Sequence, residues 1–597
     1  MPTQFLNVTF DGVNDVPRLP GDGSVSWSTG GSRPTIDRYS VFVDAPDDLD
    51  ATLNLTGSDW RIRMLQVAGD DHITRIVDGD TGSGREIEYL NLGYNSEVDL
   101  TSTRVRYMNG WEGDRHDITL GSENDWMHWL NLGADVNVVD TAVGWVGGID
   151  IYRGRGDVTV RGDVQNIGFR STDDNLVVDD GFVFSARMRG GDDTVIVRNG
   201  GRIGVLEDFG GASDVRVLKD SRLDSFRGGE GDVSIALFGS ARAESIRVYE
   251  SDLTFSSKKG YVQSIYGWEV DSDVTIGSGG IATIKFVSDA ARSHDITGSA
   301  DGYIGSIETT DSRDDATDDQ SAVVNLSYFA GSVRLGNGAD RVTTGNGETG
   351  WVENISTSGG NDVVTLGSGG AVTVGTSRGN DRINLQDLFY NEAEDGVALR
   401  GGAGTDTLSF QAFSLGVAVN LDLSGAYQEV ATGAGFFSII GIENLIGSQH
   451  ADMLTGTAIK NVISGKSGAD LILGGGGNDT IKGDAGNDML FGQLGRDTVI
   501  GGAGRDTIDG GFGNDTLRGN GGGDTFVFGN KSGTDTVADF TDGSDILRLV
   551  GHTGGFGDLT FSNAGGNREI EHDNGTIVLA GQAGLVLTQA DFDFVVA

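Results

Sequence analysis

The chain has 597 residues, no cysteine, and 88 Asp and Glu against 43 Lys and Arg, for a formal net charge of −45. These numbers exclude disulfides, thiolate metal sites and cysteine nucleophiles. A charge of this sign repels nucleic acid and anionic membranes and attracts cations. Gly is abundant at 98 residues, Pro is scarce at 5, and apolar residues make up 37%, which favours a long repeat array with a thin core over one large globule.

The N-terminal stretch MPTQFLNVTFDGVNDV lacks the basic and apolar regions of a secretory signal. No run approaches the roughly 18 apolar residues of a transmembrane helix. We therefore expect no cleavable signal of the usual kind and no membrane insertion.

The first 400 residues repeat with a period near twenty. An acid followed by alternating apolar residues recurs with gaps of 17 to 22 residues, and the same period extends from Asp50 to Asp381. The clearest of these acids are Asp157, Asp174, Asp193, Asp214, Asp232, Asp252, Asp273 and Asp295. A period of this length with two or more short strands is typical of a β-solenoid coil. The alternative is an array of β-sandwiches, whose turn signals would come every ~8–12 residues. Residues 77–86 and 311–320 interrupt the period, and we predict that both form loops.

One stretch, 111–145, concentrates aromatic and polar residues that suit a binding surface. They are Trp111, His116, Trp126, His128, Trp129 and Trp145. Trp111 and Trp129 each lie six residues before a repeating acid, Asp117 and Asp135, so we expect the two indoles to stack on adjacent coils. Such a stack either holds a sugar ring or packs against a capping segment, and we favour packing.

Residues 447–527 repeat every nine residues without a slip. Position one is Gly in all nine frames, position eight is always apolar, and position four is Gly in the last seven. Position six is Asp in every frame except the second, which has Asn461; these acids are Asp452, Asp470, Asp479, Asp488, Asp497, Asp506, Asp515 and Asp524. A flexible Gly-rich linker, or solvated acidic turns without an ion, would have no reason to keep this register.

Each nine-residue unit reads as a sharp glycine turn followed by a short strand with one inward side chain. Two units make a coil of eighteen residues, so Asp470 stacks with Asp488, Asp506 and Asp524 on one edge. Asp479 stacks with Asp497 and Asp515 on the other. Stacked loops that expose carbonyls and a carboxylate suit calcium, which takes about six to eight oxygen ligands.

The predicted metal-site residues are the seven acids from Asp470 to Asp524 and ten glycines of the same turns. These glycines are Gly474, Gly477, Gly483, Gly486, Gly492, Gly495, Gly501, Gly504, Gly510 and Gly513. Weaker candidates, whose glycine pattern is incomplete or outlying, are Asp340, Asp362, Asp381, Asp406 and Asp452. The alternative for these is an acid that merely begins a strand on a solvated edge. His450 and Ile459 replace the position-four Gly of the first two frames, which argues against calcium there.

The nine-residue block resembles the calcium-binding repeats of the RTX (repeats-in-toxin) family. GGAGTDTLS at 401–409 looks like an outlying copy, 416–448 is similar to the lead-in, 533–549 resembles the cap, and the tail LTQADFDFVVA looks like an uncleaved export signal. The resemblance implies export of the unfolded chain by the type I secretion machinery of a Gram-negative bacterium, with calcium-driven folding outside the cell.

We therefore predict an all-β chain: a right-handed parallel β-solenoid over 1–400, an RTX β-roll with its lead-in over 401–530, and a cap with the export signal over 531–597. We expect several Ca²⁺ ions and a secreted or cell-surface protein with a non-enzymatic structural, surface-layer or adhesive role. Expected partners are the secretion machinery and either a cell-surface polysaccharide or further copies of the chain in a lattice.

The alternative function is a polysaccharide lyase or epimerase with residues 111–145 as its cleft. GTSRG at 375–379 matches G-x-S-x-G but lies in a predicted β-coil instead of a strand-turn-helix. No histidine begins H-E-x-x-H. We therefore expect no catalytic residues.

Overall fold

The structure is a computed structural model of the chain. It describes residues 4–9, 25–28, 39–44, 51–56, 61–68, 73–78, 85–100, 102–111, 113–121, 127–141, 144–170, 172–288, 291–299, 302–311, 321–346, 350–387, 396–423, 425–431, 436–529 and 532–595. The chain divides into two compact units: unit 1 is Met1–Ser288 with Asp301–Tyr303, and unit 2 is Asp289–Ala300 with Ile304–Ala597. Over the described ranges all regular elements are strands, apart from three 3₁₀ turns. No described helix has the length and hydropathy that crossing a bilayer requires.

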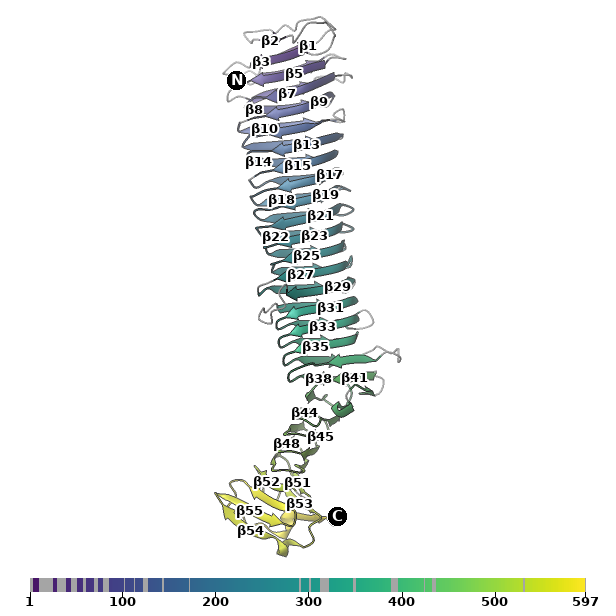
Figure 1. Ribbon diagram of the computed structural model, residues 1–597, viewed down its shortest axis with the longest axis vertical. Coiled ribbons are helices and arrows are strands. Elements are labelled where there is room, and N and C mark those ends of the chain that lie inside the picture. The colour runs from purple at the N-terminus through teal and green to yellow at the C-terminus, as the bar shows by residue number, and fades with distance from the viewer. Residues whose placement is uncertain are drawn as a thin grey trace. The chain divides into compact units, whose positions relative to one another are not determined.

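Unit 1 is a parallel β-solenoid in which each coil gives one strand to each of two sheets (Figure 1). The first sheet contains β1 (Gln4–Thr9), β4 (Ala51–Thr56), β6 (Ile73–Asp78), β8 (Asn95–Leu100), β10 (Arg115–Leu120), β12 (Val136–Thr141), β14 (Arg155–Val160), β16 (Asn175–Asp179), β18 (Asp193–Arg198), β20 (Ser213–Val217), β22 (Val233–Leu237), β24 (Leu253–Ser257) and β26 (Ser272–Ile276). The second contains β2 (Val25–Ser28), β3 (Tyr39–Asp44), β5 (Arg61–Ala68), β7 (Arg85–Leu92), β9 (Thr103–Gly110), β11 (Trp129–Leu132), β13 (Trp145–Ile151), β15 (Asp163–Phe169), β17 (Phe182–Met188), β19 (Arg202–Asp208), β21 (Arg222–Gly229), β23 (Arg242–Tyr249), β25 (Tyr261–Trp268) and β27 (Ile281–Ser288).

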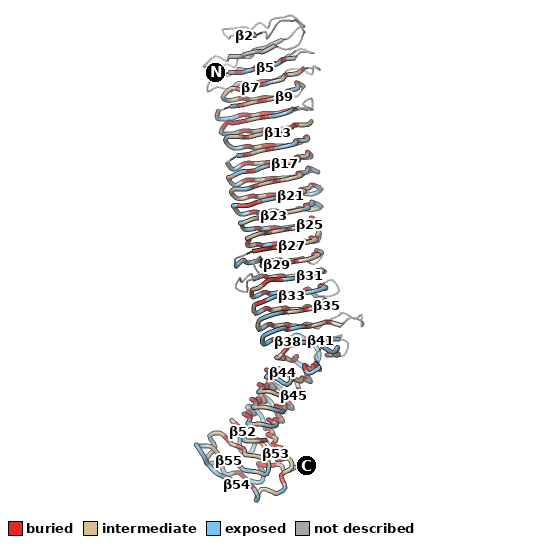
Figure 2. The backbone as a smooth tube through the Cα atoms, viewed as in Figure 1, coloured by how far each residue is buried: buried red, intermediate tan, exposed pale blue. Residues whose placement is uncertain are grey.

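The register confirms the period near twenty. Val195 pairs with Val215, and Val215 pairs with Ile235, so equivalent residues are twenty apart. All three of these side chains are buried, because successive strand residues alternate between the interior and the solvent. Figure 2 shows this alternation of buried and exposed positions along the coils. The two predicted loops fall mainly on residues 79–84 and 312–320, which lie outside the described part of the chain.

Unit 2 begins with coils of the same two-sheet kind. Its first sheet contains β28 (Ser293–Gly298), β30 (Ser321–Leu326), β32 (Arg341–Thr344), β34 (Val363–Leu366), β36 (Arg382–Gln386), β38 (Thr407–Ala412), β42 (Asn444–Ile446), β44 (Val462–Ser467), β46 (Thr480–Ala485), β48 (Thr498–Ala503), β50 (Thr516–Gly521), β52 (Gly533–Val537) and β56 (Gly575–Leu579). Its second sheet contains β29 (Ile304–Asp311), β31 (Ala330–Asn337), β33 (Val352–Gly359), β35 (Ala371–Arg378), β37 (Val397–Arg400), β40 (Tyr427–Glu429) and β41 (Phe436–Ile440), with the 3₁₀ turn η1 (Leu421–Leu423) nearby in the chain.

In the nine-residue block, a third sheet replaces the second. It contains β39 (Ala418–Asn420), β43 (Met453–Thr455), β45 (Leu471–Gly476), β47 (Met489–Leu494), β49 (Thr507–Asp509), β51 (Thr525–Phe528), β53 (Ile546–Val550) and β57 (Phe592–Val595). Ile481 pairs with Val499 in the first sheet and Ile472 pairs with Leu490 in the third, so two repeats make one coil of eighteen residues. The all-β parallel solenoid predicted from the sequence is thereby confirmed.

The end of the described chain closes unit 2 with antiparallel strands. β54 (Thr560–Ala564), β55 (Asn567–His572) and β56 form a meander, and the 3₁₀ turns are η2 (Phe556–Asp558) and η3 (Gln589–Asp591). β57, in the tail that resembles an export signal, pairs in parallel with β53. The tail is therefore an integrated strand of the folded chain.

The core of the nine-residue block is much thinner than that of unit 1. All nine position-eight side chains are fully buried, but each eighteen-residue coil holds only two of them, such as Ile472 and Ile481. The coil of unit 1 that starts at β22 buries five aliphatic side chains: Val233, Ile235, Leu237, Ile246 and Val248. Each such burial contributes about 1.5–3 kcal/mol. The block therefore has less hydrophobic free energy per residue to offset the loss of backbone entropy.

Candidate calcium-binding turns

The position-six acids form two hydrogen-bonded ladders, one along each edge of the block. In each rung, the backbone N–H of one Asp donates to Oδ1 of the Asp eighteen residues later, at 2.7 to 3.0 Å. The rungs are Asp470 to Asp488, Asp488 to Asp506 and Asp506 to Asp524 on one edge, and Asp479 to Asp497 and Asp497 to Asp515 on the other. The two stacks predicted from the sequence spacing are therefore present.

The second carboxylate oxygen of each of these acids is buried and lacks a partner. Oδ2 has no hydrogen-bond partner in Asp470, Asp479, Asp488, Asp497, Asp506, Asp515 and Asp524, and none of the seven residues is more than 2% exposed. A buried carboxylate oxygen without a donor is costly. In each of these seven equivalent positions, a cation or protonation of the carboxyl group would offset the cost of burial.

The glycines at position one let the carboxylate of the same repeat pack against the backbone of the turn. A Cβ atom at Gly474 would lie 2.6 Å from Oδ2 of Asp479 and 2.7 Å from the carbonyl oxygen of Gly492 in the next coil. The same relation to the Asp of the same repeat holds at Gly483, Gly492, Gly501 and Gly510. Each turn therefore leaves no room for a side chain beside the carboxylate oxygen, and at Gly474, Gly483 and Gly492 a carbonyl oxygen of the next coil lies close to the same point.

The glycines at position four let consecutive turns approach closely. A Cβ atom at Gly504 would collide with the carbonyl oxygen of Gly486, and φ at Gly504 is +140°, a region that side chains disfavour. Gly486, Gly495 and Gly513 have the same contact with the position-four Gly one coil earlier, and Gly477 meets Ile459 instead. The glycine pattern is therefore required by the stacking of turns.

Burial makes the charged form of these carboxyl groups unfavourable. It raises the pKa of Asp470 and Asp515 to about 7 and that of Asp479, Asp506 and Asp524 to about 6, and it also raises the pKa of Asp488 and Asp497. The backbone N–H that each Oδ1 accepts opposes this effect only in part. A cation beside Oδ2 would remove the cost of burying the charge.

The donor set of these turns fits calcium. Among the described residues no three acidic or imidazole side chains converge on one point, so an ion in the turns would take backbone carbonyls together with carboxylates from adjacent coils. Calcium prefers such all-oxygen, flexible coordination. The residues present therefore fit a calcium ion and offer no nitrogen or sulfur ligand.

The position-six acid of the first frame differs from the seven. Oδ1 of Asp452 accepts from the N–H of Val417, and its Oδ2 accepts from the N–H of Ser448 at 2.6 Å. Neither oxygen is left without a partner. In the first frame, which lacks the position-four Gly, both carboxylate oxygens of Asp452 are therefore engaged by hydrogen bonds.

Two acids that sequence reasoning missed end the ladders. The N–H of Asp515 donates to Oδ1 of Asp535 and the N–H of Asp524 to Oδ1 of Asp545, both at 2.9 Å. Asp535 and Asp545 lie 20 and 21 residues after the donors Asp515 and Asp524 instead of eighteen, so the nine-residue repeat does not extend to them. Oδ2 of Asp545 accepts from the N–H of Thr541, so it is satisfied. The G-x-D-T sequence at 533–536 was the signal that could have found Asp535.

The remaining weaker candidates also form a ladder. Asp340, Asp362 and Asp381 each donate a backbone N–H to Oδ1 of the next acid, which is Asp406 for the last of them, at 2.8 to 2.9 Å. All four are at most 2% exposed. They are inward-facing groups and not the solvated strand starts of the alternative interpretation.

Of the acids that mark the period in unit 1 and that the structure describes, only Asp174 and Asp193 are buried. Asp157 pairs with Asn175, so it occupies the column next to Asp174 and points outward. A shift of one residue turns a side chain to the other face of a strand. A period of about twenty therefore does not place the acids in one column.

The predicted stack of Trp111 and Trp129 is wrong. Trp129 pairs with Tyr107, 22 residues earlier, whereas Trp111 lies only 18 residues before Trp129 and follows the end of β9. The two indoles therefore lie at different points along their coils. Trp126 lies outside the described residues.

Of the histidines in the same stretch, His116 is completely buried and burial lowers its pKa to about 4. Neither ring nitrogen has a hydrogen-bond partner. In this conformation His116 is inside the coil and does not reach a substrate on the surface.

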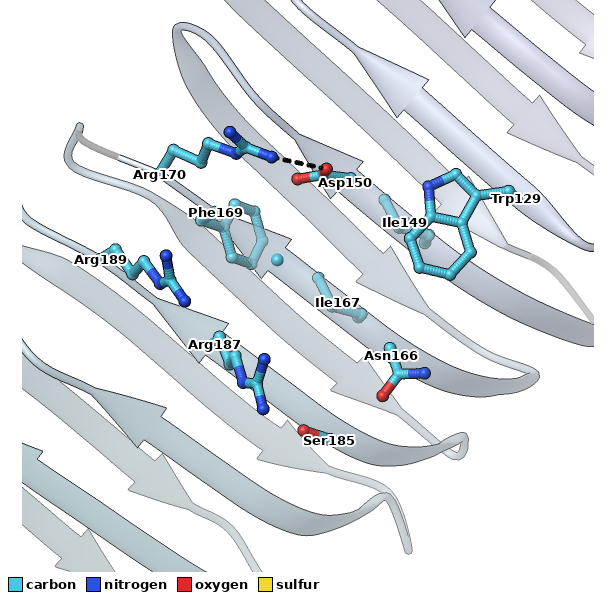
Figure 3. Close-up of a pocket in the computed structure, with 11 residues that line it drawn as sticks. Trp129, Ile149, Asp150, Asn166, Ile167, Phe169, Arg170, Ser185, Arg187 and Arg189 are labelled. Atoms are coloured by element: carbon cyan, nitrogen blue, oxygen red, sulfur yellow. Dashed lines mark hydrogen bonds and ion pairs between the residues drawn. The ribbon is translucent and has the colours of Figure 1, made fainter.

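Trp129 instead borders a surface pocket of about 390 Å³ on the second sheet of unit 1 (Figure 3). Its ring lies over Gly148, where a Cβ atom would collide with the indole. Arg170, Arg187 and Arg189 line the other side. Arg170 pairs with Asp150 at 3.2 Å and Arg187 with Glu207 at 3.0 Å. The pocket combines a flat aromatic surface with guanidinium groups.

Comparison with known proteins agrees with the geometry of the turns. Residues 455–490 and 491–526 each match the family model of the RTX calcium-binding nonapeptide repeat (4 copies). No curated protein matches the chain. Among solved structures, the extracellular lipase LipA from Serratia marcescens is similar with 18% identity and a TM-score of 0.19, over 46% of this chain and 44% of that chain. The chain thus spans less than half the length of that lipase, and a TM-score of this size does not establish a shared fold.

The matched residues contain all seven acids with an unpartnered, buried Oδ2 in the nine-residue block. Residues 455–526 are therefore RTX calcium-binding nonapeptide repeats carried within this chain.

Proposed function

We propose that this protein is secreted and folds on extracellular calcium, with Asp470, Asp479, Asp488, Asp497, Asp506, Asp515 and Asp524 as the carboxylate ligands. The observation that supports this proposal is the row of buried Oδ2 atoms without partners, in register along both edges of the repeats. The glycines named with them in the sequence let consecutive turns stack closely and place no side chain beside the carboxylates.

In this proposal, calcium binding supplies the free energy of folding that the thin hydrophobic core of the repeats lacks. Without it, stacked carboxylates are buried unpaired and two aliphatic side chains per coil must offset the backbone entropy. With it, binding free energy becomes folding free energy. One site at a hundredfold excess of calcium over its dissociation constant contributes about 2.7 kcal/mol. Extracellular calcium modules bind at roughly 10⁻⁴–10⁻³ M, so the repeats would stay open in the cell and fold outside it.

The direct test is the number of calcium ions that the full chain binds, measured by equilibrium dialysis after chelation. We expect several ions per chain with dissociation constants of roughly 10⁻⁴–10⁻³ M. Magnesium at the same concentration should not compete, because it demands rigid octahedral coordination. A chain that binds no calcium at about 10⁻² M would contradict the proposal.

We further propose that a type I secretion machinery exports the unfolded chain of a Gram-negative bacterium, with residues 1–400, 401–530 and 531–597 as solenoid, β-roll with lead-in, and cap with signal. The tail is supported as the signal by its likeness to RTX export signals. β57 is paired with β53 after folding, so the signal would be accessible only before calcium arrives.

Deleting residues 587–597 should abolish export by a co-expressed type I exporter, while deleting the meander 560–579 should not. Unchanged export without the tail would refute this role.

For the solenoid of unit 1 we propose a non-enzymatic, adhesive role at a cell surface, with an acidic polysaccharide as partner. The Trp129 pocket supports this, since sugar rings stack on indoles and guanidinium groups bind carboxylates. A lyase or epimerase would need His116 to reach a substrate at the surface, but this side chain is inside the coil. Self-association into a lattice is the competing surface role, and light scattering in calcium tests it.

The matched pair Trp129→Ala and Trp111→Ala tests the pocket, because both indoles are exposed but only Trp129 lines it. Mobility in gels containing polygalacturonate or alginate measures binding. We expect the wild type and Trp111→Ala to be retarded, and Trp129→Ala to lose at least tenfold in affinity. Equal binding by the two variants, or no binding by the wild type, would remove this surface from the account.

A further inference from the structure

The ladder of unit 2 upstream of the family match repeats the construction of the RTX turns. The backbone N–H of Asp362 donates to Oδ1 of Asp381 at 2.8 Å, as Asp470 does to Asp488 at 2.9 Å. Oδ2 is buried and has no partner in Asp340, Asp381 and Asp406, and it is buried in Asp362, whose carboxyl group also lies beside the Thr357 hydroxyl. These side chains are 2%, 0%, 2% and 1% exposed. By the criterion that separates Asp470–Asp524 from Asp452 and Asp545, the four belong with the calcium turns.

The glycine two residues before each acid is also shared. Gly338, Gly360, Gly379 and Gly404 have φ between +117° and +146°. A Cβ atom at Gly360, Gly379 or Gly404 would collide with the carbonyl oxygen of the preceding member of the series. This is the contact that Gly504 makes with Gly486 in the RTX repeats. Three consecutive pairs of turns therefore approach one another as closely as the family repeats do.

An outer ladder accompanies the inner one in both regions. The N–H of Asn380 donates to Oδ1 of Asn361 at 2.8 Å, and the N–H of Thr405 to Oδ1 of Asn380 at 2.9 Å. In the RTX repeats the N–H of Arg496 donates in the same way to Oδ1 of Asn478 at 2.9 Å. Both edges of the upstream turn are thus fixed by the same bonds, although the coils are 19 to 25 residues long instead of eighteen.

One feature differs and sets the chemistry of these turns apart. Five residues before the acid, the RTX repeats have Gly, whereas Asp362 and Asp381 have Thr357 and Thr376. The hydroxyl of Thr376 donates to the carbonyl oxygen of Gly401 at 2.7 Å. Gly401 keeps the glycine for Asp406, where a Cβ atom would lie 2.5 Å from Oδ2. The threonines place a side chain, and with it a further oxygen atom, where the RTX repeats have neither.

We propose that the turns ending at Asp340, Asp362, Asp381 and Asp406 form a second, one-edged row of calcium sites outside the RTX repeats. The row ends at Asp406, whose N–H donates to Oε2 of Glu443. The described coils of unit 1 do not repeat it: Asp174 and Asp193 are laddered and each has a buried Oδ2 without a partner, but Thr172 stands where the glycine before Asp174 would be, so no two adjacent turns are complete. The proposal rests on the proposed calcium chemistry of the family repeats.

The competing explanation is that these four carboxyl groups are simply protonated and bind no ion. The two explanations predict different effects of replacing the aspartates with asparagine. Asparagine matches a neutral carboxylic acid in shape but lacks the second anionic oxygen. Asp362→Asn with Asp381→Asn in the full chain should lower the number of bound calcium ions and abolish the calcium response of these turns. Glu353→Gln is the control, since Glu353 is exposed on the same coil and its change removes a charge without touching the ladder.

The experiment is hydrogen exchange of the full chain, read by mass spectrometry of peptides, with chelator and with calcium. We expect peptides from 338–410 to gain at least tenfold protection with calcium, and to lose this gain in the double variant but not in Glu353→Gln. If only 447–545 gains protection, or if the double variant keeps the full response, the second row does not exist. If 447–545 also fails to respond, the proposed calcium function of the family repeats fails with it.

Discussion

The backbone N–H of Asp497 donates a 2.8 Å hydrogen bond to Oδ1 of Asp515, eighteen residues later in the chain. Oδ2 of Asp515 is buried and has no partner. Each carboxylate of the ladder therefore has one oxygen that holds the preceding coil and one that is available to an ion. Because the same carboxylates join adjacent coils and are available to calcium, we expect folding and calcium binding to be coupled.

Asp497→Asn should uncouple these two roles. Asparagine keeps an Oδ1 acceptor for the N–H of Asp479 but replaces the available oxygen with an amide. We expect the variant to bind fewer calcium ions and, in saturating calcium, to lose about 1–3 kcal/mol of unfolding free energy. In chelator it should be no less stable than the wild type. Urea unfolding in both conditions measures this, with the exposed Asp422→Asn as control.

Gly504→Ala should disrupt the stacking of turns. Its Cβ atom would collide with the carbonyl oxygen of Gly486, and the residue has a φ of +140°. We expect a loss of about 2–4 kcal/mol and a higher calcium midpoint. Gly584→Ala is the matched control because nothing lies within 4 Å of its Cβ position. Thermal unfolding compares the two, and equal melting temperatures would contradict the role given to the position-four glycines.

The calcium-free repeats should lose stability as the pH rises. Without an ion, burial raises the pKa of Asp470 and Asp515 to about 7 from the ordinary value of 3.8. The folded state then binds more protons than the unfolded state between about pH 4 and pH 7, so the unfolding free energy falls across this window as the pH rises. In chelator, the folded fraction of the repeats, measured by circular dichroism, should be higher at pH 5 than at pH 8. A folded fraction that rises with pH would show that these carboxyl groups are not buried in the calcium-free chain.

The fold of the repeats was predictable because each nine-residue unit contains the residues that define its own turn and its own strand. Glycine at positions one and four permits the turn, and a single apolar residue at position eight defines the interior, so the eighteen-residue coil and the two Asp stacks follow from the spacing. Which carboxylate oxygen is engaged was not predictable. Asp452 shows this, because its Oδ2 is satisfied by the nearby N–H of Ser448, a contact that only the folded turn brings about.

The period of the upstream solenoid was predictable from the sequence. Which side chains stack on one another in adjacent coils was not. Coil lengths vary, and a shift of one residue exchanges the two faces of a strand. Asp157 and Asp174 thus belong to the same series in the sequence but to different faces in the structure. The same variation separates Trp111 from Trp129, because the coil there is 22 residues long and the spacing of the two indoles is 18.

The most direct test of calcium-driven folding is tryptic cleavage of the full chain inside the RTX repeats. Lys482, Arg496 and Arg505 lie within them and are cut only if the coils open. In chelator we expect rapid cleavage at all three, with the coils of unit 1 intact. In calcium at about 10⁻² M, well above the usual dissociation constants of extracellular modules, the same bonds should resist. Equal cleavage of these bonds with and without calcium would contradict the account.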